Sequence, residues 1–228
     1  MRIGVLGSGL LGGKLGTLLA RAGHEVVFSY ARSVAKLERL ARATKANARA
    51  GSVAEAVRDA DLLLLAVHWS RIEDVIAQAG ELSGKVLINC SLPMNQDDTA
   101  LVLGCSSSGA ERLAQILPRT RVVSALNTVP SEVLVGVYET RRRMRRPNMV
   151  YCGDDAAAKK LTAGLIRDLG FDPVDAGDLH IARYFEPFAL LMAQLAYEGK
   201  GGPRLAYWIS RAGARPSGTS PARSRRTR

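Results

Sequence analysis

The chain has 228 residues, of which 47% are hydrophobic and 5% aromatic, and a formal net charge of +11. This composition excludes general disorder and allows one large domain whose core is mainly aliphatic. The longest charge-free apolar stretch in a strand-like context, residues 62–67, is too short to cross a bilayer. Three cysteines without a Cys-x-x-Cys pair indicate neither a disulfide framework nor a structural zinc site. We therefore expect a soluble cytoplasmic protein without a metal site.

Strands and helices are predicted to alternate along most of the chain. In chain order the pattern predicts strand 2–6, helix 10–22, strand 25–30, helix 33–46, helix 52–60, strand 62–67, helix 70–79 and strand 85–89. After a long loop at 91–107 it predicts a helix from Ser108, strands 121–126 and 148–152, helix 156–169, strand 172–174, helix 178–197 and one or two further turns at 204–211. Alternation of this kind predicts a mostly parallel sheet joined by right-handed crossovers.

A complete G-x-G-x-x-G motif connects the first predicted strand to the first predicted helix. Its residues are Gly7, Ser8, Gly9, Leu10, Leu11 and Gly12. The first glycine permits a tight turn, the second lets a pyrophosphate approach the backbone, and the third lets the helix pack on the strand. The free N–H groups of the helix then favour the phosphates. We interpret the motif as a dinucleotide site; the alternative is a glycine-rich turn without a ligand.

The end of the second predicted strand favours NADP(H) over NAD(H). An NAD-dependent protein places an acid there to bind the ribose 2′-hydroxyl, but this sequence continues from Ser29 and Tyr30 to Arg32 and Ser33 without one. The Arg32 guanidinium can bind a 2′-phosphate with two charge-assisted hydrogen bonds, and Ser29, Ser33 and Lys36 could assist it. The alternative is a solvated Arg32 in a surface loop.

Several short segments together resemble the NADP oxidoreductases that depend on the deazaflavin coenzyme F420. The resemblance covers roughly residues 1–210. The matching segments are 7–12, 22–27, 66–69, 108–111, 123–128, 152–155, 174–179 and 182–187. It implies a doubly wound Rossmann α/β sheet with extra strands and C-terminal helices, a homodimer, and hydride transfer between NADP(H) and F420 or a similar small-molecule acceptor.

The nicotinamide pocket is expected where parallel strands end, at the switch in strand order. This rule places Val67, His68 and Trp69, residues 91–94, and Asn127 with its neighbours 126 and 128 around the ring. His68 is the one candidate acid–base residue, with pocket lining as the alternative. The family pattern has a proline at this position, and a more acidic segment than residues 89–93. We interpret Cys90 as a small apolar residue rather than a nucleophile.

The remaining features concern domain limits and charge. We expect an NADP-binding domain at 1–177, a helical segment closing the cleft at 178–212, and a disordered basic tail at 213–228. The tail has no interleaved aromatic residues, so we do not expect nucleic acid as a partner. The arginine-rich run at 141–146 is either a solvated surface or a funnel for an anionic coenzyme.

No Tyr-Lys or Ser-His-Asp constellation is evident along the chain. Hydride transfer between aligned rings needs orientation more than it needs an acid, so the sequence is consistent with a deazaflavin acceptor. Three alternatives stay open: an NADPH-dependent reductase of a flavin, quinone, metal chelate or imine; a non-catalytic NADP sensor; and a nucleic-acid-binding protein.

Overall fold

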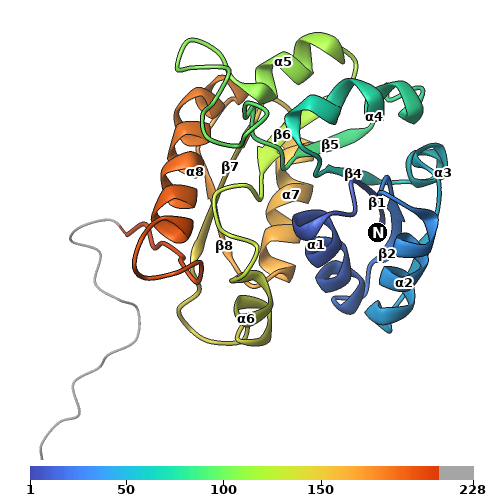
Figure 1. The fold of residues 1–228 in the computed structure, drawn as a ribbon, viewed down its shortest axis with the longest axis horizontal. Coiled ribbons are helices and arrows are strands. Elements are labelled where there is room, and N and C mark those ends of the chain that lie inside the picture. The colour runs from blue at the N-terminus through green and yellow to red at the C-terminus, as the bar shows by residue number, and fades with distance from the viewer. Residues whose placement is uncertain (211–228) are drawn as a thin grey trace, which may run out of the picture.

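The computed structural model describes residues 1–210, which form one eight-stranded sheet with helices on both faces (Figure 1). The strand order is β3-β2-β1-β4-β5-β6-β7-β8. The strands are β1 (Arg2–Leu6), β2 (Glu25–Ser29), β3 (Ala48–Ala50), β4 (Leu62–Leu65), β5 (Val86–Asn89), β6 (Arg121–Ala125), β7 (Asn148–Gly153) and β8 (Asp172–Asp175). Among the strands of residues 1–210 the β6–β7 pair alone is antiparallel, so the predicted Rossmann-type, mostly parallel sheet is confirmed.

Helices cover the sheet in two layers. The helices are α1 (Leu10–Arg21), α2 (Val34–Thr44), α3 (Val53–Arg58), α4 (Ile72–Ala79), α5 (Gly109–Ile116), α6 (Leu134–Glu139), α7 (Ala156–Asp168) and α8 (Ala182–Tyr197), with 3₁₀ turns η1 (Trp69–Arg71) and η2 (Leu179–Ile181). One core cluster holds side chains of α1, α2, α6 and α7, and the other holds those of α3, α4, α5 and α8.

The central strand β4 shows why the sheet needs both layers. Its sequence is four leucines, and all are buried. Successive side chains of a strand point to opposite faces, so Leu62 and Leu64 join the first core and Leu63 and Leu65 join the second. A continuous apolar run of this kind is typical of a strand that is buried on both faces.

The structure differs from the predicted elements at three places. The short edge strand β3 and the one-and-a-half-turn helix α6 have no clear periodicity and were not predicted. The prediction of helical turns at 204–211 is wrong for residues 204–210, which are neither helix nor strand. Tyr207 instead accepts a hydrogen bond from Asn148 N at its carbonyl, and its ring packs edge-on against Phe188.

Two further findings concern the described part of the chain. None of its helices combines the length and apolar character needed to span a membrane. Within residues 1–210 no three His, Cys, Asp or Glu side chains are grouped so that they could hold a metal ion. The predicted tail at 213–228 lies outside the described residues, as does the end of the predicted segment 178–212.

Candidate functional site

The glycine motif has the geometry that a pyrophosphate site requires. Gly7 has φ +111°, and a Cβ added to it would lie 2.4 Å from the Ala66 carbonyl oxygen. A Cβ on Gly12 would lie 1.9 Å from the Gly7 oxygen, so the start of α1 can approach β1 only without a side chain there. A Cβ on Gly9 meets nothing within 4 Å. The first and third glycines therefore shape the turn, while the second borders open space where a phosphate group fits.

Two serines assigned to the cofactor stabilise this turn instead. The Ser8 hydroxyl donates to the Ser29 carbonyl at 2.9 Å, and the Ser29 hydroxyl donates to the Val5 carbonyl at 2.8 Å. Both side chains are buried. Their contribution is thus to hold the ends of β1 and β2 together, because each hydroxyl proton is already used within the protein.

The loop after β2 presents one basic group to solvent. Tyr30 adopts a left-handed conformation with φ +53°, and its hydroxyl donates to Asp74 on α4. Burial, followed by the hydrogen bond with Asp74, raises the pKa of Tyr30. The Ser33 hydroxyl caps α2 by accepting from Lys36 N at 3.3 Å. Arg32 is exposed between these anchored residues, so its guanidinium can meet a 2′-phosphate from the solvent side.

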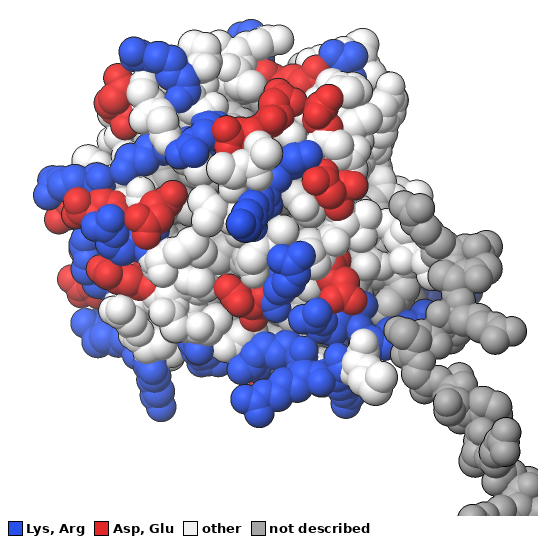
Figure 2. Space-filling view, turned by 180° about the vertical axis from the view of Figure 1, so that it is seen from behind, with Lys and Arg blue, Asp and Glu red and all other residues white. Residues whose placement is uncertain are grey.

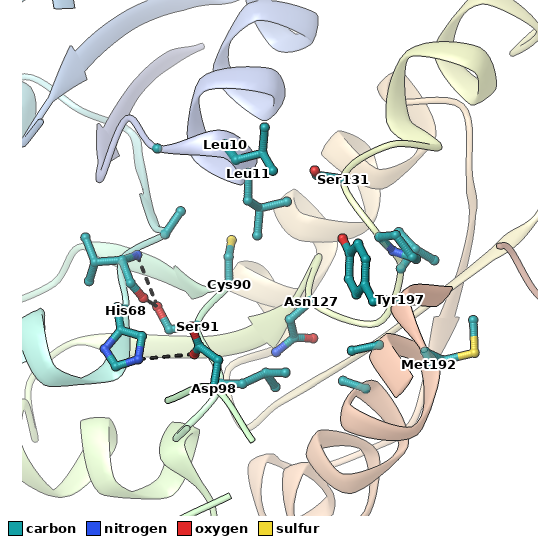
Figure 3. Close-up of a pocket in the computed structure, with 18 residues that line it drawn as sticks. Leu10, Leu11, His68, Cys90, Ser91, Asp98, Asn127, Ser131, Met192 and Tyr197 are labelled. Atoms are coloured by element: carbon teal, nitrogen blue, oxygen red, sulfur yellow. Dashed lines mark hydrogen bonds and ion pairs between the residues drawn. The ribbon is translucent and has the colours of Figure 1, made fainter. Parts of the chain in front are cut away.

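A cavity of about 540 Å³ opens beside the glycine motif, at the carboxyl ends of β1, β4, β5 and β6 (Figure 3). Residues from all four strand ends and from α8 line it. They are Gly9, Leu10, Leu11, Ala66, Val67, His68, Cys90, Ser91, Leu92, Asp98, Asn127, Val129, Pro130, Ser131, Ala189, Met192, Ala193 and Tyr197. Its position is the one that the switch in strand order between β1 and β4 predicts for a ligand. Leu10 and Leu11, two motif residues, form part of its wall.

Asn127 carries the one orphaned side-chain amide of this wall. Among the described residues neither its Oδ1 nor its Nδ2 has a hydrogen-bond partner, although both atoms are buried. Figure 3 shows the amide pointing into the cavity from the loop after β6. Leaving a donor and an acceptor unpaired is costly, so the amide is suited to a ligand with a complementary donor and acceptor.

Lys36 lies apart from this cavity. It lines a second hollow of about 490 Å³ between α1 and α2, together with Lys14 and Arg21. Gly9 and Leu10 border both hollows. Lys36 is therefore a neighbour of the motif on its outer side, and its predicted contact with the 2′-phosphate stays a prediction.

His68 lines the cavity, but both of its ring nitrogens are engaged. Nδ1 accepts from Ser70 N at 3.2 Å, which caps η1. Nε2 lies 3.1 Å from Asp98 Oδ1 and 3.2 Å from the Asn95 carbonyl oxygen. Because Nδ1 is an acceptor, Nε2 carries the proton and donates it to these oxygens. These contacts favour a structural role for His68, as a wall residue that holds the 91–107 loop. They argue against the catalytic interpretation.

Two neighbours of the predicted pocket lie outside the cavity lining, and a third, Cys90, lines it without a charge. Trp69 lies outside the cavity lining and packs near Gly109 and Pro93 in the second core. Thr128 is fully buried and hydrogen-bonds Tyr207. Burial raises the pKa of the Cys90 thiol far above its ordinary value, so Cys90 carries no thiolate. The structure thus agrees with the interpretation of Cys90 as an apolar residue.

The far wall of the cavity was not predicted from the sequence. Ala189, Met192 and Tyr197 come from α8, and Ser131 comes from the loop after β6. The spacing of residues 189, 192, 193 and 197 is the one sequence feature that groups them, because residues so spaced share one face of a helix. Nothing local shows that this face meets a strand end more than 60 residues earlier in the chain.

The arginine-rich run is partly structural. Arg146 pairs with Asp172 at 2.8 Å, and the Arg141 guanidinium stacks 3.9 Å from the centre of the Tyr138 ring. Arg142 and Arg143 are exposed. Figure 2 shows acidic and basic side chains interleaved over most of one face, with basic groups gathered along its lower edge. In this run Arg146 therefore holds β8 and Arg141 packs on the end of α6, while Arg142 and Arg143 lie on the surface.

Comparison with known proteins agrees with this site. Residues 2–93, which contain the glycine motif, β2 and β4, match the family model described as NADP oxidoreductase, coenzyme F420-dependent. The resemblance predicted from the sequence is confirmed over these residues. The described class, an NADP oxidoreductase, is also the enzyme class that the motif predicts.

Relatives extend the likeness over most of the chain. Rat metalloreductase STEAP3 is 29% identical over 189 residues, which is 83% of this chain but 36% of that protein. The chain thus spans about a third of the curated relative that it matches. A crystal structure from Arthrobacter sp. FB24, provisionally described as an F420-dependent NADP reductase, is 26% identical with a TM-score of 0.81, and covers 92% of this chain and 100% of the other.

A more distant neighbour shares the fold alone. The reductive aminase of Aspergillus terreus, solved in complex with NADPH and ethyl-5-oxohexanoate, has a TM-score of 0.62 at 20% identity, over 85% of this chain and 61% of that chain. Rossmann-type reductases with different acceptors therefore share this architecture, because the fold holds the dinucleotide and the variable walls choose the substrate.

Proposed function

We propose that this chain is an NADPH-dependent reductase that delivers hydride to coenzyme F420 or a similar small acceptor. The observation that carries the proposal is the open cavity that joins the glycine motif to the unpaired Asn127 amide. One end of this space suits a pyrophosphate and the other suits a carboxamide. The family description of residues 2–93 supports the same class of reaction.

The described residues fit NADPH at three points. The Gly9 position leaves open space for the pyrophosphate, and the N–H groups at the start of α1 face it. Exposed Arg32 would bind the 2′-phosphate. The Asn127 amide would bind the nicotinamide carboxamide, whose donor and acceptor match its own. When bound, NADPH supplies a hydride to the acceptor, and the protein contributes orientation and exclusion of water.

The cofactor part of the proposal is tested with Arg32→Ala. We expect NADPH affinity to fall about tenfold to hundredfold, the scale of a hydrogen bond to a charged group, while NADH affinity hardly changes. Arg39→Ala, which removes another exposed arginine from α2, is the matched control and should change neither. Equal affinities of the unaltered protein for NADPH and NADH would refute the 2′-phosphate site.

The acceptor part is tested by mixing the protein, NADPH and oxidised F420. We expect the visible band of the deazaflavin to bleach at a rate proportional to protein concentration, and Gly9→Val to abolish the bleaching. NADPH binding without bleaching would refute F420 as the acceptor. NADPH binding without turnover of any acceptor would favour the non-catalytic sensor instead.

A second candidate is reduction of a metal chelate, directly or through a flavin. It is favoured by the 29% identity with a protein named as a metalloreductase. NADPH oxidation that depends on a flavin and a ferric chelate, in the absence of F420, would support this candidate over the first.

The proposed assembly is a homodimer. Two aliphatic side chains on α8, Leu191 and Leu195, are 53% and 51% exposed. Exposed apolar surface of this kind is typical of an interface. Light scattering of the purified protein should give twice the chain mass, and Leu191→Glu should give the single chain mass.

A cytoplasmic location stays a prediction from cysteine usage.

A further inference from the structure

Four polar side chains from three separate segments form one hydrogen-bonded chain at the mouth of the cavity. Lys14 on α1 donates from Nζ to the Ser131 hydroxyl at 3.0 Å. The Ser131 hydroxyl donates to Glu132 Oε2 at 3.3 Å, and the Tyr197 hydroxyl donates to the same oxygen at 2.9 Å. Ser131 and Tyr197 belong to the cavity wall, and Figure 3 shows both beside it.

The protonation states along this chain are set by its own members. Burial opposes the charge on Glu132, but the hydrogen bond from Tyr197, with the nearby Lys14, outweighs it, and the pKa of Glu132 is lowered. Burial and the Glu132 carboxylate raise the pKa of Tyr197 to about 12. Near neutral pH a carboxylate at Glu132 therefore faces a protonated phenol at Tyr197.

We propose that Tyr197 delivers the proton that accompanies hydride transfer, and that Lys14 replaces it through Ser131 and Glu132. The inference rests on the proposed function and narrows its substrate class. A relay of this kind serves acceptors that take hydride at carbon and a proton at nitrogen, such as an imine or a deazaflavin. It also serves a flavin, which takes hydride at one ring nitrogen and a proton at another.

The step balances in atoms and electrons. The acceptor gains two electrons and a C–H bond, or in a flavin an N–H bond, with the hydride from NADPH, and the nitrogen that becomes more basic forms an N–H bond with the Tyr197 proton. Ser131 then gives its proton to the Glu132 carboxylate as it takes one from Lys14, and the Glu132 carboxylic acid so formed gives its proton to the Tyr197 phenolate. The chain ends with a neutral Lys14 amine, its other members unchanged, and solvent restores the ammonium.

The alternative donor, His68, is poorly placed for this role. Its Nε2 proton is directed to Asp98 and the Asn95 carbonyl, and its Nδ1 accepts from Ser70 N. Tyr197 lies on α8, is 55% exposed as a residue, and connects through Glu132 to a lysine that solvent can recharge. Both candidates already direct their proton to a carboxylate, but within residues 1–210 the contacts of Tyr197 also continue through Glu132 and Ser131 to a lysine that can supply a replacement proton.

The first experiment compares Tyr197→Phe with Tyr184→Phe, which removes a hydroxyl from the same helix outside the cavity. Single-turnover NADPH oxidation is measured with F420, flavin mononucleotide and a cyclic imine. For each acceptor that the unaltered protein reduces, we expect Tyr197→Phe to lower the rate roughly 100-fold or more, the scale of general acid catalysis. Added ammonium or imidazolium buffer should partly restore the rate. Tyr184→Phe should match the unaltered protein.

A second comparison separates charge from proton transfer at Lys14. Lys14→Arg keeps the positive charge but presents a group that does not give up its proton. We expect Lys14→Arg and Lys14→Gln to slow turnover alike, with NADPH affinity unchanged. Full activity of Lys14→Arg would show that Lys14 acts through its charge, and would overturn its place in the relay.

A readout without turnover checks the hydrogen-bonded chain itself. Ultraviolet titration, taken as the difference between the protein and its Tyr197→Phe variant, reports ionisation of the Tyr197 phenol. We expect Glu132→Gln to lower that pKa, because the neighbouring charge is removed. Turnover by Tyr197→Phe equal to that of the unaltered protein would overturn the relay and leave the proposed function intact. Absence of turnover by the unaltered protein with all three acceptors would overturn both.

Discussion

Glu186 on α8 is a buried carboxyl group whose ionisation should control stability. It is 1% exposed, and its two oxygens accept hydrogen bonds from Gly109 N at 2.8 Å and Ala110 N at 3.1 Å, at the start of α5. Burial raises the pKa of Glu186 from 4.5 to about 7, although the two backbone N–H groups act in the opposite direction. Nearby Glu111, which pairs with Arg183, adds a smaller increase.

The direction of the effect follows from proton binding. Between pH 4.5 and about 7 the folded protein keeps a proton on Glu186 that the unfolded chain releases. The stabilisation is therefore complete below pH 4.5 and is lost as pH rises through 7. At roughly 1.4 kcal/mol per pH unit, the separation between the two pKa values corresponds to about 3 kcal/mol of unfolding free energy.

Glu186→Gln isolates this contribution. Glutamine is neutral at every pH and has one oxygen, so one N–H of α5 loses its acceptor at a pH-independent cost of about 1–3 kcal/mol. Urea unfolding between pH 4.5 and 8, followed by tryptophan fluorescence, gives the free energy of both proteins. We expect the advantage of the unaltered protein over Glu186→Gln to shrink by about 3 kcal/mol across this range. The control Glu139→Gln, an exposed acid on α6, should run parallel to the unaltered protein. A constant difference between the unaltered protein and Glu186→Gln would refute the reasoning.

Three further predictions concern the cofactor site. Gly9→Val should leave the unfolding free energy nearly unchanged yet abolish NADPH binding by calorimetry, since its side chain enters open space; retained affinity would show that the motif holds no dinucleotide. Gly12→Ala should destabilise the fold by about 1–3 kcal/mol or more in urea, because its Cβ meets the Gly7 oxygen; unchanged stability would contradict this packing. His68→Ala should lower turnover less than about tenfold, well below the loss expected for an acid catalyst; a loss of 100-fold would restore the catalytic interpretation.

Much of the proposed dinucleotide site could be predicted from local sequence. The turn at Gly7, the start of α1 and the buried run of β4 each depend on neighbouring residues and on periodicities of a few positions. Asn127 could also be placed, because parallel strands end at one edge of the sheet and the residue follows such an end. The absence of an acid after β2 and the presence of Arg32 are likewise local properties, and together they favour NADPH.

The cavity wall formed by Ser131 and α8, by contrast, was decided by tertiary structure. Ser131 and Tyr197 are 66 positions apart in the sequence, and α8 brings them together by packing across α5 and the end of the sheet. The hydrogen bonds that connect Tyr197 to Lys14 through Glu132 and Ser131 therefore have no signature in sequence spacing. The same holds for residues 204–210, whose weak helical pattern is overridden by the hydrogen bonds of Tyr207 with β7 and Thr128. Local turns and periodicities are set by nearby atoms, whereas side chains that meet across the fold depend on how whole elements bury their apolar faces.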